Sequence, residues 1–418
     1  MRASPRREKR PVPPKNRTTN QKAIGKQPPA AAFSTPAVLK AARRVAAMEV
    51  CDHCLGRQFA QVSTGMTNLE RGRLLRGLLR GKEPKRCTVC GEVFTRLDAY
   101  AAEAKEKAAG IEFSTFVVGT VLNADLASRE EDLWEEVGID SCEPLKSEIN
   151  RELGKKIGAL LGKDYDPVAD VTFTLDLAAG QVRLAVRSLF IAGSYQKLVR
   201  GIPQTKWSTY AVTVEDIVAK PLMKASLAEG HAFHGMGRED IDARCLDWRP
   251  FVFELERPSA RSLDLVSLEK QVNRSKKVQV RGFRFTDKEE VRRLKALRPD
   301  KSYRVLVEFT RPVQQKDLAA LKTLRGIINQ QTPSRVLHRR ADLLRKRAVK
   351  EIAGKAVGSR RAVIEVRGQA GLYVKELVTG DQGRTRPSVA ELFGPVTVKE
   401  LDVIKIHVKG YGPSKQRK

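Results

Sequence analysis

Five charged residues crowd the segment from Gly237 to Arg244, and they are the strongest chemical signal in this sequence. The segment reads Gly-Arg-Glu-Asp-Ile-Asp-Ala-Arg, so three carboxylates lie between two arginines. A carboxylate beside fixed cations stays ionised and is aimed by them, which is what an aspartate nucleophile requires. A charged turn in which Asp240 or Asp242 caps a helix explains the same pattern. Spacing alone therefore leaves a catalytic and a structural interpretation open.

Four cysteines form a second chemical pattern. They occur as two Cys-x-x-Cys pairs, Cys51 with Cys54 and Cys87 with Cys90. Two such pairs are typical of a tetrahedral zinc site, and four thiolates leave no open position for catalysis. The sequence therefore predicts one structural Zn²⁺. A redox role is the weaker alternative, because two pairs occur and no thioredoxin-like pattern surrounds them.

Two tyrosines occur in patterns that fit either a core or a binding site. Tyr303 begins an alternating apolar run that predicts a strand, where it could simply belong to the core. Tyr373 and Lys375 are two residues apart, so in an extended segment they would share one face. A flat aromatic ring on such a face can stack on a planar ligand. A half-buried pair at a strand edge is the structural alternative.

Basic residues gather in two further segments. Residues 330–347 contain Arg335, Arg339 and Arg340, and residues 383–388 contain Arg384. Such runs usually form a solvated face, but they also suit phosphate contacts.

The overall charge agrees with a polyanionic partner. The 418 residues carry 78 Lys or Arg against 49 Asp or Glu, giving a net charge of +29. The usual partner of such a field is nucleic acid. No apolar run is long enough to span a membrane, so we expect no membrane association. Six cysteines in so long a chain fit a reducing cytoplasm better than a disulfide scaffold.

Composition, cysteine spacing and hydrophobic pattern together divide the chain into four predicted segments. They are a disordered basic arm (1–35), a zinc-binding segment (36–109), an α/β segment (110–207) and an α+β domain with a mainly antiparallel sheet (208–418). In the last segment, strands are predicted at 251–255, 278–285, 303–309, 362–367 and 401–408. Helices are predicted near 287–297, 316–324 and 339–353.

The charged segment resembles the catalytic loop of the archaeal and eukaryotic tRNA pseudouridine synthases that carry a THUMP domain. That family reads roughly G-R-E-D-x-D-x-R-x-L-G-x-G-R-P-F, which this chain matches at 237–246 and 249–251. It departs at Asp247-Trp248, where the family has a glycine-containing turn. Residues 190–205 resemble the closing strand and loop of a THUMP domain, with Ser194 in place of an arginine. Residues 330–347 and 371–388 resemble further family motifs.

The resemblance implies a fold and a set of roles. The fold would be α+β, with an N-terminal zinc knuckle and a THUMP-like RNA-binding region (110–207) before a pseudouridine synthase domain (208–418). Asp240 would be the nucleophile, oriented by Lys375, and the enzyme would need no catalytic cofactor and no nucleotide. The remaining site residues would contact the substrate (Arg238, Tyr303, Tyr373) or the RNA (Arg335, Arg339, Arg340, Arg384).

The resembling archaeal enzymes modify uridines 54 and 55 in the T loop of tRNA. We therefore expect a cytoplasmic isomerase, a monomer, that binds tRNA and converts uridine 55 and also uridine 54. The main alternative is a non-catalytic zinc-containing RNA-binding protein, which would leave the acidic loop unexplained. A THUMP-bearing methyltransferase or thiolase would need a glycine-rich cofactor loop, which we do not find. A metal nuclease using Glu239, Asp240 and Asp242 is a third alternative.

Overall fold

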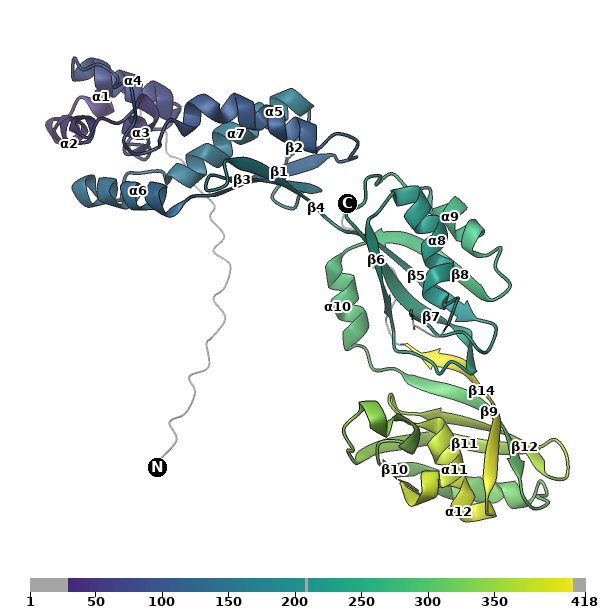
Figure 1. The fold of residues 1–418 in the computed structure, drawn as a ribbon. Coiled ribbons are helices and arrows are strands. Elements are labelled where there is room, and N and C mark those ends of the chain that lie inside the picture. Colours follow the sequence, from purple (N-terminus) through teal and green to yellow (C-terminus); the bar gives the residue numbers. More distant parts are fainter. Residues whose placement is uncertain (1–28, 207–209, 409–418) are drawn as a thin grey trace, which may run out of the picture. The chain divides into compact units, whose positions relative to one another are not determined.

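The computed structural model describes residues 29–206 and 210–408, and the chain divides into two compact units (Figure 1). Helices occur together with a large, mainly antiparallel sheet, so the expected α+β class is confirmed. Among the described residues, none of the helices has the length and apolar character needed to cross a membrane.

The N-terminal region is helical around the cysteine pairs. Its helix α4 begins at a capping box in which the Thr67 hydroxyl and the Glu70 carboxylate each bond the other's backbone N–H. Most of the expected basic arm, residues 1–28, lies outside the described residues. Its last part is helix α1, whose Phe33 is fully buried, so the predicted disorder is wrong for that part. The elements are α1 (Pro29–Phe33), α2 (Pro36–Ala47), α3 (Asp52–Arg57), α4 (Asn68–Leu78), η1 (Val93–Arg96), α5 (Leu97–Lys107), α6 (Ala124–Val137) and α7 (Leu145–Leu161).

A small sheet follows, with strand order β2-β1-β3-β4. In β3 every second residue is buried, because the apolar Val171, Phe173 and Leu175 alternate with polar residues along the strand. The strands are β1 (Thr115–Val121), β2 (Asp164–Tyr165), β3 (Val171–Asp176) and β4 (Gln181–Val186).

A ten-stranded sheet makes up most of the second unit. Its order is β13-β10-β11-β12-β9-β14-β7-β5-β8, with β6 paired to β7. Every pair in it is antiparallel except β14 with β7, which confirms the expected mainly antiparallel sheet. Its strands are β5 (Leu189–Lys197), β6 (Gly230–Gly235), β7 (Ala243–Glu256), β8 (Val278–Thr286), β9 (Asp300–Phe309), β10 (Gly326–Gln330), β11 (Arg345–Ala356), β12 (Arg361–Gly368), β13 (Thr385–Arg386) and β14 (Val396–His407).

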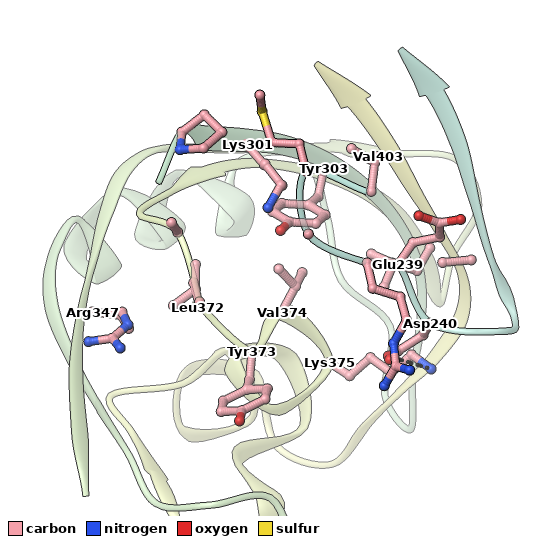
Figure 2. Close-up of a pocket in the computed structure, with 18 of the residues that line it drawn as sticks. Glu239, Asp240, Lys301, Tyr303, Arg347, Leu372, Tyr373, Val374, Lys375 and Val403 are labelled. Atoms are coloured by element: carbon pink, nitrogen blue, oxygen red, sulfur yellow. Dashed lines mark ion pairs between the residues drawn. The ribbon is translucent and has the colours of Figure 1, made fainter. Parts of the chain in front are cut away.

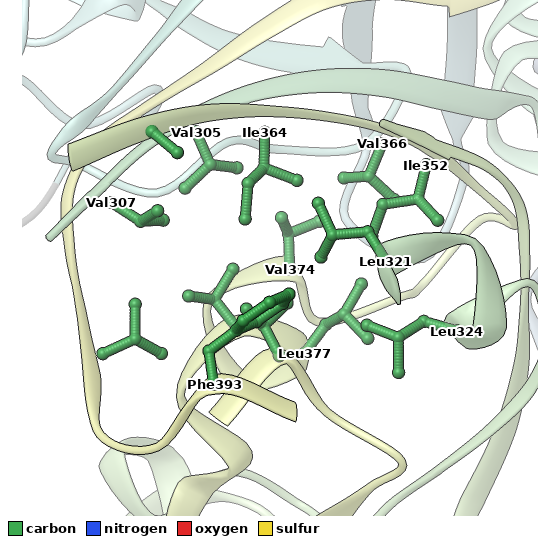
Figure 3. Close-up of a cluster of buried hydrophobic side chains, with 14 of the residues drawn as sticks. Val305, Val307, Leu321, Leu324, Ile352, Ile364, Val366, Val374, Leu377 and Phe393 are labelled. Atoms are coloured by element: carbon green, nitrogen blue, oxygen red, sulfur yellow. The ribbon is translucent and has the colours of Figure 1, made fainter. Parts of the chain in front are cut away.

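Helices cover this sheet and build its cores. Val305 and Val307 on β9 pack with Ile364 on β12, and with Leu377 and Phe393 from short helices (Figure 3). A second core includes α8, α9 and the β5–β8 end of the sheet. The helices of this unit are α8 (Val214–Ser226), α9 (Leu265–Val272), α10 (Lys288–Ala296), η2 (Asp317–Leu324), η3 (Ser334–Arg339), α11 (Val374–Thr379), η4 (Gly380–Gly383) and α12 (Val389–Phe393).

Two segments differ from the sequence prediction. The helix expected at 339–353 is wrong, because residues 345–356 form strand β11, which pairs with β10 on one side and β12 on the other. A bulge between Val349 and Glu351 places the buried Val349 and Ile352 three residues apart, which imitates helical spacing. Strand β5, expected to close the THUMP-like segment, instead pairs with β7 and β8 in the large sheet.

Candidate active site

The acidic segment forms the connection between β6 and β7, and its backbone conformation depends on a glycine. Gly237 adopts a φ of +72°, which favours glycine strongly. A Cβ atom there would also lie 3.3 Å from Lys301 Nζ and 3.5 Å from Arg249 Nη1. The glycine therefore permits both the turn and the close approach of two cationic side chains.

A buried lysine anchors the backbone of the acidic segment at Asp240 and Ile241. The Lys197 side chain on β5 is fully buried. Its Nζ donates to the carbonyl oxygens of Ile202 at 2.9 Å, Asp240 at 3.0 Å and Ile241 at 3.2 Å. Burial lowers the pKa of Lys197, and the nearby Glu239 carboxylate partly opposes this shift. The strand that was expected to end an RNA-binding module thus positions the acidic loop.

Glu239, directly before Asp240, points into the protein. Its carboxylate lies 3.2 Å from Arg249 Nε, and neither side chain is exposed. The Tyr195 hydroxyl donates to Glu239 Oε2 at 3.0 Å, and the Gln204 amide donates to Gly237 O at 3.0 Å. Because the interior carboxylate is paired and hydrogen-bonded, Glu239 acts as an internal anchor and Asp240 is left facing outward.

Asp240 lies on the wall of a cavity, between two cations. Its Oδ2 is 3.2 Å from Arg335 Nη2 and 3.4 Å from Lys375 Nζ. Lys375 is closer to Asp242, whose two oxygens both lie 2.7 Å from Nζ. Burial raises the pKa of Asp242, but the hydrogen bonds and charge of Lys375 outweigh it, so the net shift is downward. The two acids therefore share one lysine, and Arg335 is the second cation at Asp240.

The cavity measures about 480 Å³ and presents two tyrosines (Figure 2). Burial raises the pKa of Tyr303 to about 12. Tyr373 is held through its backbone by the fully buried Gln330, whose amide accepts from Tyr373 N at 2.9 Å and donates to Tyr373 O at 2.8 Å. The Tyr373 hydroxyl accepts from Arg340 Nη1 at 3.0 Å. A flat aromatic ring, a carboxylate and several cations thus border one space.

The structure brings together most of the residues that the sequence singled out. Those that line the cavity are Arg238, Asp240, Tyr303, Arg335, Arg340, Tyr373 and Lys375. Arg384 lies elsewhere, where it donates to the Thr332 carbonyl at 3.0 Å and pairs with Asp342. The side chain of Arg339 is outside the described part of the chain.

Two expectations about local structure change here. The extended segment predicted for Tyr373 and Lys375 is wrong: Tyr373 precedes helix α11 and Lys375 lies in its first turn. Arg335, for which the family resemblance implies RNA contact, also lies beside protein carboxylates, since its Nε is 2.7 Å from Glu376 Oε1.

Sequence reasoning missed Lys197, Lys301 and Glu376 as parts of this site. The contact from Lys197 to the Asp240 carbonyl crosses 43 positions in the chain. No local pattern encodes such a contact. Lys301 had a usable signal, because it lies two residues before Tyr303 on the same strand and must share its face.

The four predicted cysteine ligands also come together. The sulfur atoms of Cys51, Cys54, Cys87 and Cys90 all lie within 4.8 Å of one another, and three of the residues are buried. The Sγ atoms of Cys51 and Cys90 are 3.7 Å apart. Ligands about 2.3 Å from a tetrahedral zinc ion are separated by about 3.8 Å, so the donor set fits such an ion.

Comparisons with known proteins match most of the chain. A family described as "Pus10, C-terminal" matches residues 190–407, and one described as "Pus10 THUMP domain, archaeal" matches residues 100–176. A tRNA pseudouridine synthase Pus10 from Methanothrix thermoacetophila is 41% identical, and the match covers 85% of this chain and 91% of that protein. The Pus10 protein from Pyrococcus furiosus is 38% identical, covering 86% of this chain and 95% of its own.

Proposed function

This chain belongs to the Pus10 family of tRNA pseudouridine synthases, and we propose that it isomerises uridine 55, and also uridine 54, in the T loop of tRNA. The family membership makes it an RNA-modifying isomerase. The observation that carries the proposal for this chain is Asp240, which faces a cavity bordered by two tyrosines and is flanked by Arg335 and Lys375.

Asp240 is the proposed nucleophile. The hydrogen bond from Lys197 Nζ to the Asp240 carbonyl oxygen fixes the backbone of Asp240. Arg335 and Lys375 fix the direction of its carboxylate. Attack at ribose C1′, attack at uracil C6 and abstraction of the C2′ proton all begin from this position. In each route the bond between ribose C1′ and uracil N1 breaks and the uracil rotates. A new bond forms between C5 and C1′, C5 loses its proton and N1 gains one.

Tyr373 and Tyr303 would hold the extruded base. A stacked aromatic ring contributes about 1–3 kcal/mol per base, whichever base is present. The Tyr373 ring can turn little, because Gln330 fixes its backbone and Arg340 bonds its hydroxyl. This arrangement favours a single orientation for a planar ring that enters the cavity.

The wider surface supports tRNA as the substrate. The net charge of +29 suits a large polyanion, and residues 100–176 match an archaeal THUMP domain. The THUMP domain would bind the acceptor end of the tRNA, and the exposed Arg238 and Arg340 would meet phosphates near the flipped nucleotide. Because Arg335 binds Asp240 and Glu376, its proposed role is to orient the nucleophile in addition to contacting RNA.

The cysteine cluster would hold one structural Zn²⁺ through Cys51, Cys54, Cys87 and Cys90. Four thiolates would complete its coordination, so the metal would stabilise the N-terminal helices and take no part in the reaction. A monomer in a reducing cytoplasm remains the expected state.

Unmodified tRNA transcript tests this proposal. After incubation with the protein, chemical mapping should find pseudouridine at position 55, and an acceptor–T-arm minihelix should react better than the isolated T loop. Neither added Mg²⁺ nor a chelator should change the rate within the assay time. Binding without any pseudouridine would support the non-catalytic alternative. Modification confined to the anticodon arm would refute the proposed target.

A further inference from the structure

One ammonium group faces the catalytic cavity without a protein partner. Lys301 lies on β9, two residues before Tyr303, and Figure 2 shows the two side chains together, with Tyr373 across the cavity. Within residues 29–206 and 210–408, no carboxylate or carbonyl forms an ion pair or hydrogen bond with Lys301 Nζ. Lys197 and Lys375, the other lysines at the site, both have protein partners.

The surroundings explain why this cation stays unpaired. Lys301 Nζ and Arg249 Nη1 both lie within 3.5 Å of one point beside Gly237, so the lysine has a buried guanidinium behind it. Glu239 is nearby, but its carboxylate already forms an ion pair with Arg249 and accepts a hydrogen bond from the Tyr195 hydroxyl. Burial, followed by the charge of Arg249, lowers the pKa of Lys301 to about 8, despite the opposing influence of Cys245 and Glu239. Arg298, an exposed residue of the cavity rim, acts in the same direction as Arg249.

The proposed reaction creates a charge that such a cation would stabilise. When the bond between C1′ and N1 breaks, its electron pair passes into the uracil ring and spreads over N1, O2 and O4. The charge disappears when C5 bonds to C1′, the C5 proton leaves and N1 is protonated. A donor fixed beside a carbonyl oxygen of the detached base lowers the energy of this intermediate more than that of the neutral uridine.

We propose that Lys301 donates a hydrogen bond to a carbonyl oxygen of the extruded uracil and stabilises the negative charge on the detached base. This inference rests on the proposed isomerase function and assigns a further residue to it. Lysine carries only donors, so the same group disfavours an exocyclic amino group at that place. Lys301 would thereby select uracil over cytosine if the contact is made to O4.

Three variants separate this role from a structural one. Lys301→Met removes the charge, whereas Lys301→Arg retains it in a group that stays protonated at alkaline pH. Lys405→Met removes an exposed ammonium from the neighbouring strand β14. Single-turnover rates and tRNA dissociation constants would be measured with unmodified transcript. We expect Lys301→Met to react about 100-fold more slowly, as for loss of one preorganised donor, with tRNA affinity within about threefold of wild type. Lys405→Met should match wild type.

The pH dependence gives a second readout. The wild-type rate should fall above about pH 8 as Lys301 loses its proton, whereas Lys301→Arg should keep its rate above that pH. The inference is overturned if Lys301→Met reacts like Lys405→Met, or if the arginine variant shows the same alkaline decline as wild type. If Lys301→Met fails to fold, the arginine profile decides alone. A wild-type protein that forms no pseudouridine would instead refute the proposed function itself.

Discussion

Replacing Lys197 by methionine is the sharpest test of how the fold positions the acidic loop. Of the three carbonyls that Lys197 bonds, two retain another donor: Asp240 O accepts from Ala243 N and Ile241 O from Gly201 N. In Lys197→Met the buried Ile202 carbonyl loses the hydrogen bond that Lys197 donates to it. Losing a hydrogen bond from a charged group at a buried acceptor costs about 1.5–3 kcal/mol.

Two smaller effects adjust that figure in opposite directions. Glu239 loses a cation 3.8 Å away, which is destabilising, whereas methionine avoids the cost of burying an ammonium. Because these two effects oppose each other, we expect a net loss of about 1.5–3 kcal/mol in the free energy of unfolding. Because a displacement of about 1 Å can cost 10²-fold in rate, we expect single-turnover activity to fall by roughly 10- to 100-fold.

Urea unfolding followed by circular dichroism would measure the stability, and mapping of tRNA transcript the rate. Lys277→Met is the matched control, since Lys277 is exposed and its backbone carbonyl bonds Leu198 N next to Lys197. Wild-type stability and wild-type rate in Lys197→Met would refute the anchoring role.

Three further predictions follow from the same structure. Asp402, bonded to Arg244 and Arg200, has a pKa of about 2, because these arginines outweigh the opposing effect of burial. The contribution of Asp402 to the free energy of unfolding is present above its unfolded pKa near 4 and is lost as the pH falls towards 2. Asp402→Asn should therefore cost about 1–2 kcal/mol at pH 7. In urea titrations the variant should lose less stability than wild type between pH 4 and 3. Purified protein should contain one zinc by elemental analysis, and Cys87→Ser should lose it, whereas full zinc in that variant would contradict the ligand set. Tyr373→Ala should lower the rate far more than Tyr373→Phe, because the flat ring matters more than the hydroxyl, and equal losses would point instead to the hydroxyl.

The sequence predicted regular strands well and irregular ones badly. Alternation of apolar residues located β9 and β12, because a residue period of two needs no knowledge of the neighbouring strands. Strand β11 was missed since its bulge breaks that period. The short helix α11 was read as extended because six residues are too few to display a helical period.

The site could be predicted where its residues lie close together in the sequence. The acidic loop and the cysteine pairs are local patterns, and the structure brings each set together. Lys197 and Arg335 reach Asp240 from 43 and 95 positions away. Their roles come from pairing of distant strands and loops, which spacing in one sequence cannot reveal.

Asp240→Asn is the measurement that tests the central claim most directly. The substitution preserves the shape of the side chain and removes its negative charge and nucleophilicity, while the surrounding basic surface is unchanged. With unmodified tRNA transcript and single-turnover mapping, we expect no detectable pseudouridine and a tRNA dissociation constant within a few-fold of wild type. Asp242→Asn, which removes the other acid bound by Lys375, is the matched control and should retain activity. Substantial turnover by Asp240→Asn, or abolished turnover in Asp242→Asn alone, would contradict the assignment of Asp240 as the nucleophile.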